Sequence, residues 1–493
     1  MAGERVSAVA PDVLDASSAG TSALRGSILR TASYVFSILL SLISARVLIG
    51  HLGEANFGHY TAVLALVTIV AGFTEGGLNS IVVREFATLG GEKRREMMAS
   101  AIGMRLVLTA VGVAVAVAFA ALAGYTSAEV LGTALAGIGL VFQLLQSTLS
   151  MTLQAQLRFG WVSAAEILRQ VVNVALLVAL ALAGAGLLPL LAVAIPASLV
   201  SLLFTIPLVL RYTSLRPSFH PERWWRLLRE TIPWAVIAAV NVVYFRVALV
   251  LMSVIAGGLQ IGYFATSFRI SEVLVGVPGL VIGAAFPILA RAEREDAARF
   301  NYASGRIFAL ALFAGTWLVL SLEVGAGFAI HVIAANKADP SIEVLRIQGL
   351  ALIASFVAVA CGYPLLMMRR YREVLVSNLL ALAISAILTL SLAPSLGARG
   401  AALAALVAEI GLALSQTVML RRAAPGVPMP ISTVAAVAVA GGGAAAVGLL
   451  LPVNPVIGVV VAGVVYCAVL RLLGRFPPEV REILLDRVRP GVR

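Results

Sequence analysis

The chain has 493 residues, of which 60% are hydrophobic and only 12% charged, and its mean hydropathy is +1.00. A soluble protein of this length needs far more polar surface, so the composition excludes a soluble globular fold. Apolar runs of about 20 residues follow one another almost without a break, and each is long enough to cross roughly 30 Å of hydrocarbon. Because lipid offers backbone groups no partners, these runs must be helices, and the sequence predicts an all-α polytopic membrane protein. The alternating pattern of a membrane barrel is absent.

The chain begins with a polar segment, residues 1–24, that is predicted to be a disordered cytoplasmic tail. It has no apolar core of a signal peptide. About fourteen transmembrane helices follow, as judged from the length of the apolar runs. The expected spans are 27–49, 60–82, 101–124, 130–152, 162–184, 187–210, 231–255, 262–288, 303–323, 344–368, 373–394, 398–420, 430–451 and 455–473.

Positive charge alternates between the connections that join these spans. The odd-numbered connections hold only Lys337, Arg346 and Arg399, whereas most of the 36 Lys and Arg residues follow even-numbered spans or lie at the two ends. The positive-inside rule predicts this alternation and places both termini in the cytoplasm. The basic loops then face an anionic leaflet, which accounts for the net charge of +12 without nucleic acid.

A basic segment near the middle divides the chain into two lobes. It carries Trp224 and Trp225 behind two prolines, a pattern typical of an amphipathic linker on the cytoplasmic membrane surface. Six spans precede it and eight follow, so we expect two six-helix lobes with pseudo-two-fold symmetry plus two C-terminal helices. The expected parts are the N-lobe at 25–211, the linker at 212–230, the C-lobe at 231–422, the last two helices at 423–475 and a cytoplasmic tail at 476–493.

Each lobe opens with the same kind of hairpin, in which charges lie inside apolar runs. In the first, Arg46 ends an apolar run, a Gly-rich turn follows, and Glu75 lies in the second run. In the second, Arg246, a Gly-rich turn and Arg269 take the corresponding places. The recurrence indicates an internal duplication in which both lobes start from the cytoplasm.

No group of residues has the spacing of a hydrolase, a metal site or a phosphate-binding loop. Cys361 and Cys467 both lie in apolar runs and indicate no disulfide framework. A membrane polymerase or glycosyltransferase would need a large outer loop or a cytoplasmic catalytic domain, and the longest outer connection, at 324–343, is short. We therefore expect no enzyme activity, no cofactor and no metal.

Arginines inside apolar runs are the candidate substrate-binding residues. A charge at mid-bilayer costs about 3 kcal/mol and usually faces a cavity or a partner, and arginine binds phosphate bidentately. Arg246 lies about fifteen residues into its span, roughly 22 Å from the cytoplasmic end, with no acid near it in sequence. For Arg269 the alternative is a pair with Glu272 at i, i+3. For Arg46 and Arg30 the alternative is anchoring at the membrane edges.

Acids in the same spans are candidates for ion coupling or for counter-charges. Glu75 lies mid-span, and it either couples a cation or proton or pairs with an arginine of the first span. Glu272 follows Arg269 on one helix face, and Glu409 lies in the twelfth span. Ionisable groups at such depth often form proton or ion pathways.

Short motifs at corresponding places of the two halves carry a resemblance to a known family. The first half contains Leu52-Gly53, Phe57-Gly58, Tyr60, Gly76-Gly77 and Arg84-Glu85. The second contains Gly262-Tyr263-Phe264-Ala265, Arg269-Ile270 and Phe286-Pro287. These motifs resemble those of bacterial polysaccharide-biosynthesis flippases, over roughly residues 25–425. These flippases belong to a superfamily that also contains the multidrug and toxin extruders and the lipid II flippases.

The resemblance implies two six-helix lobes around a cavity that opens alternately to either side of the bacterial inner membrane. It also implies a lipid-linked oligosaccharide as cargo, carried on undecaprenyl diphosphate, and polysaccharide polymerase machinery as a partner beside the lipid bilayer. Arg246 and Arg269 match a diphosphate headgroup by position. A cation-coupled multidrug or metabolite exporter of the same superfamily is the alternative, with Glu75 and Glu409 as its main site.

Overall fold

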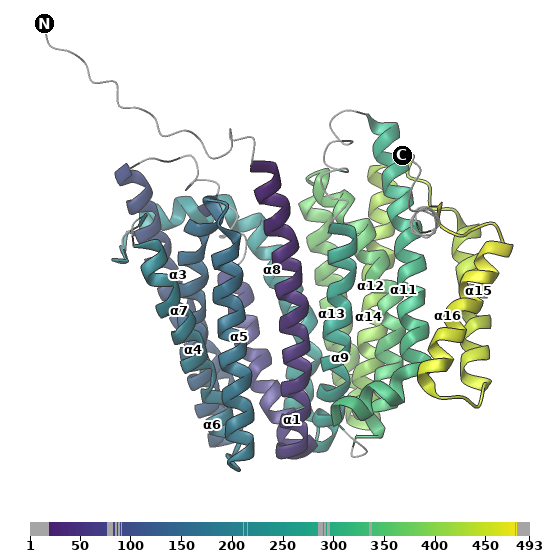
Figure 1. The fold of residues 1–493 in the computed structure, drawn as a ribbon, viewed down its shortest axis with the longest axis horizontal. Helices are drawn as coiled ribbons and strands as arrows, with labels where there is room; N and C mark the ends of the chain where they lie inside the picture. The colour runs from purple at the N-terminus through teal and green to yellow at the C-terminus, as the bar shows by residue number, and fades with distance from the viewer. Residues whose placement is uncertain are drawn as a thin grey trace, which may run out of the picture. The chain divides into compact units, whose positions relative to one another are not determined.

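The structure, a computed structural model, describes residues 19–75, 82–83, 86, 89, 91–210, 212–213, 215–283, 289, 292, 296–334, 338–478 and 480. Within these residues all regular secondary structure is helical and no strand occurs. The helices of the first half are α1 Ala19–Glu75, α3 Gly91–Leu122, α4 Ser127–Ala155, α5 Phe159–Leu182, α6 Leu187–Ala192 and α7 Ala194–Val209 (Figure 1). Those of the second half are α8 Pro221–Ile255, α9 Gly258–Gly283, α11 Ala297–Ala334, α12 Pro340–Met367, α13 Tyr371–Leu396, α14 Ala398–Ala423, α15 Ile431–Leu450 and α16 Pro455–Leu472.

Twelve segments in the described part of the chain are long and apolar enough to cross a membrane. They differ from the expected spans at two places. α1 merges the expected spans 27–49 and 60–82 into one element, and α9, which covers most of the expected span 262–288, is not among the twelve. The predicted all-α polytopic fold is confirmed, and the count of fourteen is approximate.

Two local breaks follow from residue type. Gly53 has φ +71° and ψ 170° inside α1, a conformation that only glycine adopts readily, so the expected Gly-rich turn is a kink within one element. Pro196 has no N–H to donate to the carbonyl of Ala192, and its ring crowds that carbonyl. The expected span 187–210 is accordingly split at Val193 into α6 and α7.

The chain forms two compact units, each with most of its contacts inside the unit. The first contains Thr74–Ala118 and Leu131–Ile232 with the start of the chain up to Ser44, and the second contains Ala45–Phe73, Phe119–Val130 and Pro233–Arg493. The division after Ile232 lies close to the expected start of the C-lobe at 231, but the part of α1 from Ala45 to Phe73 belongs to the second unit. The expected lobe boundaries stay a prediction.

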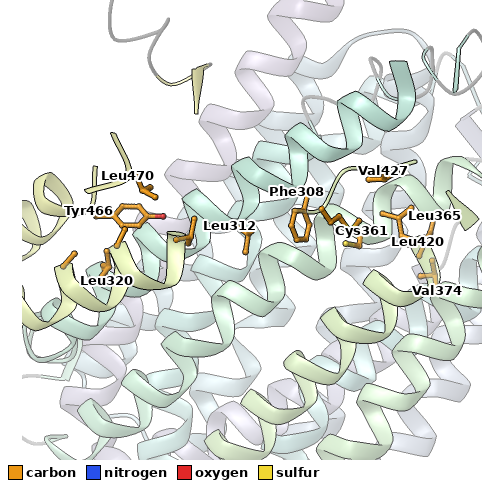
Figure 2. Packing of buried hydrophobic residues seen from close by; sticks show 14 of the residues in the cluster. Phe308, Leu312, Leu320, Cys361, Leu365, Val374, Leu420, Val427, Tyr466 and Leu470 are labelled. Atoms are coloured by element: carbon orange, nitrogen blue, oxygen red, sulfur yellow. The ribbon is translucent and has the colours of Figure 1, made fainter. Parts of the chain in front are cut away.

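The core of the second unit is built around α11. Phe308 and Leu312 of α11 pack with Cys361 of α12 and Leu420 of α14 (Figure 2). Tyr466 of α16 stacks on Phe313 at a centroid distance of 5.5 Å, and its hydroxyl donates to the Phe313 carbonyl at 3.3 Å. The hairpin of α15 and α16 is thereby packed along α11, as Figure 1 also shows.

The amphipathic segment before the second lobe is continuous with a spanning helix. Residues 221–230 form the first turns of α8, which has 35 residues and is about 52 Å long, against roughly 30 Å of hydrocarbon. Trp224 packs against a buried cluster that contains Phe86 and Met98, whereas Trp225 is 62% exposed. The two tryptophans therefore lie on different faces of the helix, about 100° apart around its axis.

Candidate functional site

Two arginines and one carboxylate form a charged triad between α8 and α9. Nη2 of Arg246 donates to Oε1 of Glu272, and Nη1 of Arg269 donates to Oε2 of the same carboxylate at 3.0 Å. The side chains are 14%, 32% and 23% exposed for Arg246, Arg269 and Glu272. Two cations on one anion leave a net positive charge, so the triad can attract a further anion.

Aromatic rings hold the triad in place. The Arg246 guanidinium carbon lies 5.6 Å from the ring centroid of Phe245 and 5.4 Å from that of Phe268. The two rings are themselves 5.1 Å apart. An arginine that lies against two adjoining aromatic rings is stabilised by cation–π attraction and loses little freedom when it binds an anion.

The sequence anticipated one of these two ion pairs. The i, i+3 pair of Arg269 with Glu272 is present in α9. Arg246 has no acid near it in sequence, and its partner Glu272 comes from the facing helix, 26 residues away along the chain. Glu272 is therefore a counter-charge for both arginines.

A cavity of about 60 Å³ lies beside the triad and shares Phe245 and Phe268 with it. This is space for several water molecules. Polar side chains from five helices, α8, α9, α12, α13 and α14, contribute to its lining. Ser271 of α9 donates to Gln348 Oε1 of α12 at 3.0 Å, and Glu409 of α14 also lines the space.

Glu409 has hydroxyl neighbours on two other helices. Tyr244 of α8 and Ser355 of α12 line the cavity together with it. Gln348 is 5% exposed, and its Nε2 has no hydrogen-bond partner among the described residues. A carboxylate with hydroxyl and amide groups around a small cavity can hold a cation or a proton.

The other sequence candidates lie elsewhere. Arg46 donates to the carbonyl oxygens of His331, at 3.3 Å, and of Val332, near the C-terminal end of α11. Cations favour that end of a helix, so these contacts match edge anchoring. The side chain of Arg30 lies outside the described residues, as do Gly76-Gly77, Arg84-Glu85 and the two tails at 1–18 and 481–493. Glu75 lies at the end of α1 near Arg105.

Arg105 is a buried cation that is not among the candidates predicted from the sequence. It is 1% exposed, and its guanidinium donates to Thr148 Oγ1 and to the Thr74 carbonyl, each at 3.3 Å. It lies near the start of an apolar run, where a positive charge is not unusual. The signal that could have revealed it is the lack of any acid within helical reach on α3, which requires a partner on another helix.

A family model of polysaccharide biosynthesis proteins matches residues 23–293, more than half of the chain. The chain belongs to this polysaccharide biosynthesis protein family. The matched region includes both arginines and the glutamate of the triad. A search among curated proteins finds no match.

Solved structures with the same fold as this family member include a lipid II flippase, MurJ, in an inward closed conformation. The two are 14% identical with a TM-score of 0.75, over 91% of this chain and 99% of that chain. An inward-facing multidrug resistance MATE family transporter of the MOP superfamily is 14% identical with a TM-score of 0.61, over 79% of this chain and 95% of that one. An outward-facing multidrug resistance MATE family transporter of the MOP superfamily is 15% identical with a TM-score of 0.59, over 82% of this chain and 96% of that one. At these identities the likeness shows the fold, that of a multi-pass membrane protein.

Proposed function

We propose that the protein is a flippase of the bacterial inner membrane, with both termini in the cytoplasm. It moves an undecaprenyl-diphosphate-linked oligosaccharide from the cytoplasmic to the outer leaflet by alternating access, for surface polysaccharide synthesis. Membership of the polysaccharide biosynthesis protein family supports a role in polysaccharide synthesis, and a lipid II flippase has the same fold. The observation that carries the proposal is the net positive triad of Arg246, Arg269 and Glu272 inside apolar helices.

The triad explains how a cationic site stays in the membrane without cargo. A buried cation without a partner is costly, and Glu272 supplies that partner to both arginines. A diphosphate brings at least two more negative oxygens, which the two guanidinium forks can bind bidentately while Glu272 keeps one of their bonds. The lipid tail remains in the bilayer while the headgroup is held.

The cavity beside the triad suggests how the cycle draws energy. Glu409, with Tyr244 and Ser355, would bind the coupling cation or proton. Phe245 and Phe268 line this cavity and also hold Arg246, so occupation of the cavity can shift the arginine that holds cargo. Glu75 serves as a counter-charge, and polysaccharide polymerase machinery would take the flipped product. Arg46 and Arg30 would guide the headgroup at the two membrane edges.

The same cavity favours one other function, a cation-coupled exporter of drugs or metabolites. Most of its lining is apolar, which would suit a hydrophobic cation against the Glu409 carboxylate. In that case Glu409 would hold the cargo and the arginines would be dispensable.

Headgroup binding and flipping by triad variants separate the two functions. The purified protein would be titrated with a short-chain prenyl diphosphate oligosaccharide, and flipping would be followed in proteoliposomes. Arg246→Gln and Arg269→Gln should each weaken binding about tenfold or more and abolish flipping, because each removes a charge-assisted fork. Glu272→Gln should tighten binding and slow release, because both arginines lose their competing partner.

Arg370→Gln is the matched control, since Arg370 forms an i, i+3 pair with Glu373 but is 53% exposed at the start of α13. It should leave both measurements unchanged. Glu409→Gln should slow gradient-driven flipping and leave headgroup binding intact. If Arg246→Gln binds and flips normally while Glu409→Gln loses export of a cationic dye, the exporter function replaces the proposal.

A further inference from the structure

α1 changes its packing partner within three residues. Gly72 lies against α8, and a Cβ there would come within 2.7 Å of the Val242 Cβ. Two residues later the Thr74 carbonyl accepts a hydrogen bond from Nη2 of Arg105 in α3, at 3.3 Å. The second unit's share of α1 also ends at Phe73, and the first unit's share begins at Thr74. The change of packing partner and the boundary of the two units thus coincide in α1 at residues 72–74, which form a joint.

One guanidinium holds the later side of this joint. Arg105 is the only arginine or lysine among the described side chains that is fully buried, at 1% exposure. Its Nη1 donates to Thr148 Oγ1 of α4 at 3.3 Å, and its charge faces Glu75, the last described residue of α1. Arg105 therefore ties the end of α1 to α3 and α4 at once.

Burial decides what kind of role this arginine can have. A side chain that is 1% exposed offers no surface to a cargo headgroup. Its charge must be compensated where it lies, because an uncompensated buried ion is strongly destabilising. The planar fork of arginine can bond a carbonyl and a hydroxyl on two different helices together, which the point charge of lysine does less well.

We propose that Arg105 is a positioning residue that anchors the end of α1 at Thr74 and Glu75, and that α1 bends at residues 72–74 during transport. The proposal rests on the alternating-access function proposed above. If the two units move, a helix that belongs to both must deform at the point where it passes from one unit to the other. Hinges are the few residues whose backbone φ and ψ angles take up such a movement. Arg105 fixes one side of this hinge, and the Gly72 contact with Val242 fixes the other.

The test compares three readouts in Arg105→Gln, Arg105→Lys and Arg95→Gln. Arg95 is an exposed arginine of the same helix and serves as the control. Hydrogen exchange is measured for α1 peptides over 68–75 and 56–63, and headgroup affinity and flipping rate are measured as above. Arg105→Gln should accelerate exchange at 68–75 about fivefold or more, because the tie that holds this end is lost, and leave 56–63 unchanged.

The same variant should slow flipping about tenfold while headgroup affinity stays within about twofold, since a hinge residue governs a motion and not a binding contact. Arg105→Lys should recover part of the rate, and Arg95→Gln should match the wild type. Unchanged exchange at 68–75, or unchanged flipping, would overturn the proposal. Loss of headgroup affinity would also overturn it, because Arg105 would then belong to the binding site.

Two further comparisons keep the result decisive. If Arg105→Gln does not fold, Thr148→Val removes one of the two hydrogen bonds and should change exchange and flipping in the same direction but less. Normal behaviour of that variant would count against the joint. Exchange needs no cargo, so a wild-type protein that flips nothing while exchange at 68–75 responds would reject the proposed function and support the anchor.

Discussion

Two glycines allow α1 and α9 to approach backbone to backbone. A Cβ on Gly58 would lie 2.6 Å from the Gly262 nitrogen and 2.9 Å from the Ile261 carbonyl carbon. A Cβ on Gly262 would in turn overlap the Glu54 carbonyl oxygen. Both glycines belong to the motifs that resemble the flippases, so at these positions the motif is explained by close helix packing.

Gly58→Ala should therefore lower the thermal stability of the purified protein. The methyl group meets backbone atoms that cannot rotate away, and overpacking of this kind costs about 1–3 kcal/mol. Gly50→Ala is the matched control on the same helix, because a Cβ there has no atom within 4 Å. Alanine favours a helix over glycine, so the control should keep or raise the melting temperature. Equal melting temperatures for both variants would show that α1 and α9 are not in backbone contact.

At the same scale, the sequence revealed which charges are unusual but not what they face. Arg246 and Arg269 stand out because each interrupts an apolar run. The partner that Arg246 shares with Arg269 lies on the neighbouring helix, and the register of two packed helices depends on side-chain shapes that one chain's hydropathy does not encode. Arg105 was missed for the same reason, since its partners lie 31 and 43 residues away.

At the scale of elements, α4 begins with a capping box that another helix completes. Thr126 precedes α4, and its N–H and hydroxyl each donate to Glu129 Oε2 at 2.7 Å, while the Glu129 N–H donates to the Thr126 hydroxyl at 3.3 Å. The other carboxylate oxygen, Oε1, is 2.6 Å from His59 Nδ1 of α1. The Glu129 carboxylate therefore accepts hydrogen bonds at the start of α4 and also links α4 to α1.

Glu129→Ala should destabilise the protein more than the cap alone accounts for. Loss of an N-terminal cap costs about 1 kcal/mol, and His59 would also lose its partner. A double-mutant cycle with His59→Ala, read from melting temperatures, should show that the two changes are not additive. His331→Ala is the control, because the His331–Asp339 pair has side chains 44% and 65% exposed and such pairs contribute little. Strict additivity would mean that His59 and Glu129 do not act together.

At the scale of the whole molecule, the apolar runs predicted where the helices lie in the sequence, but they did not predict which helices pack together. Run length sets the number of crossings because the bilayer has a fixed thickness. The kink at Gly53 joined two expected spans, and the segment Ala45–Phe73 clusters with residues far along the chain. That segment's contacts, such as Gly58 with Gly262, span about two hundred residues, and no local pattern specifies them.

Contacts within the second unit link five odd-numbered connections into a ring. His59 pairs with Glu129, and Tyr125 bonds Ser253. The ring then runs from Gln260 to the Ala398 N–H at 2.9 Å, from Arg399 to Glu343, and from His331 and Val332 back to Arg46. Connections that touch must lie on one side of the membrane, which is the arrangement that alternating positive charge predicts.

Which side of the membrane this ring faces is the last prediction, and it decides where the two termini lie. The odd-numbered connections are poor in Lys and Arg, so they should lie outside, and the even-numbered ones in the cytoplasm. In a chain with Cys361→Ala and Cys467→Ala, Ser395→Cys and Val453→Cys should react with an impermeant maleimide in intact spheroplasts. His220→Cys and Pro425→Cys should react only after permeabilisation, and all four positions are exposed in the structure. Labelling of His220→Cys in intact spheroplasts would invert the topology.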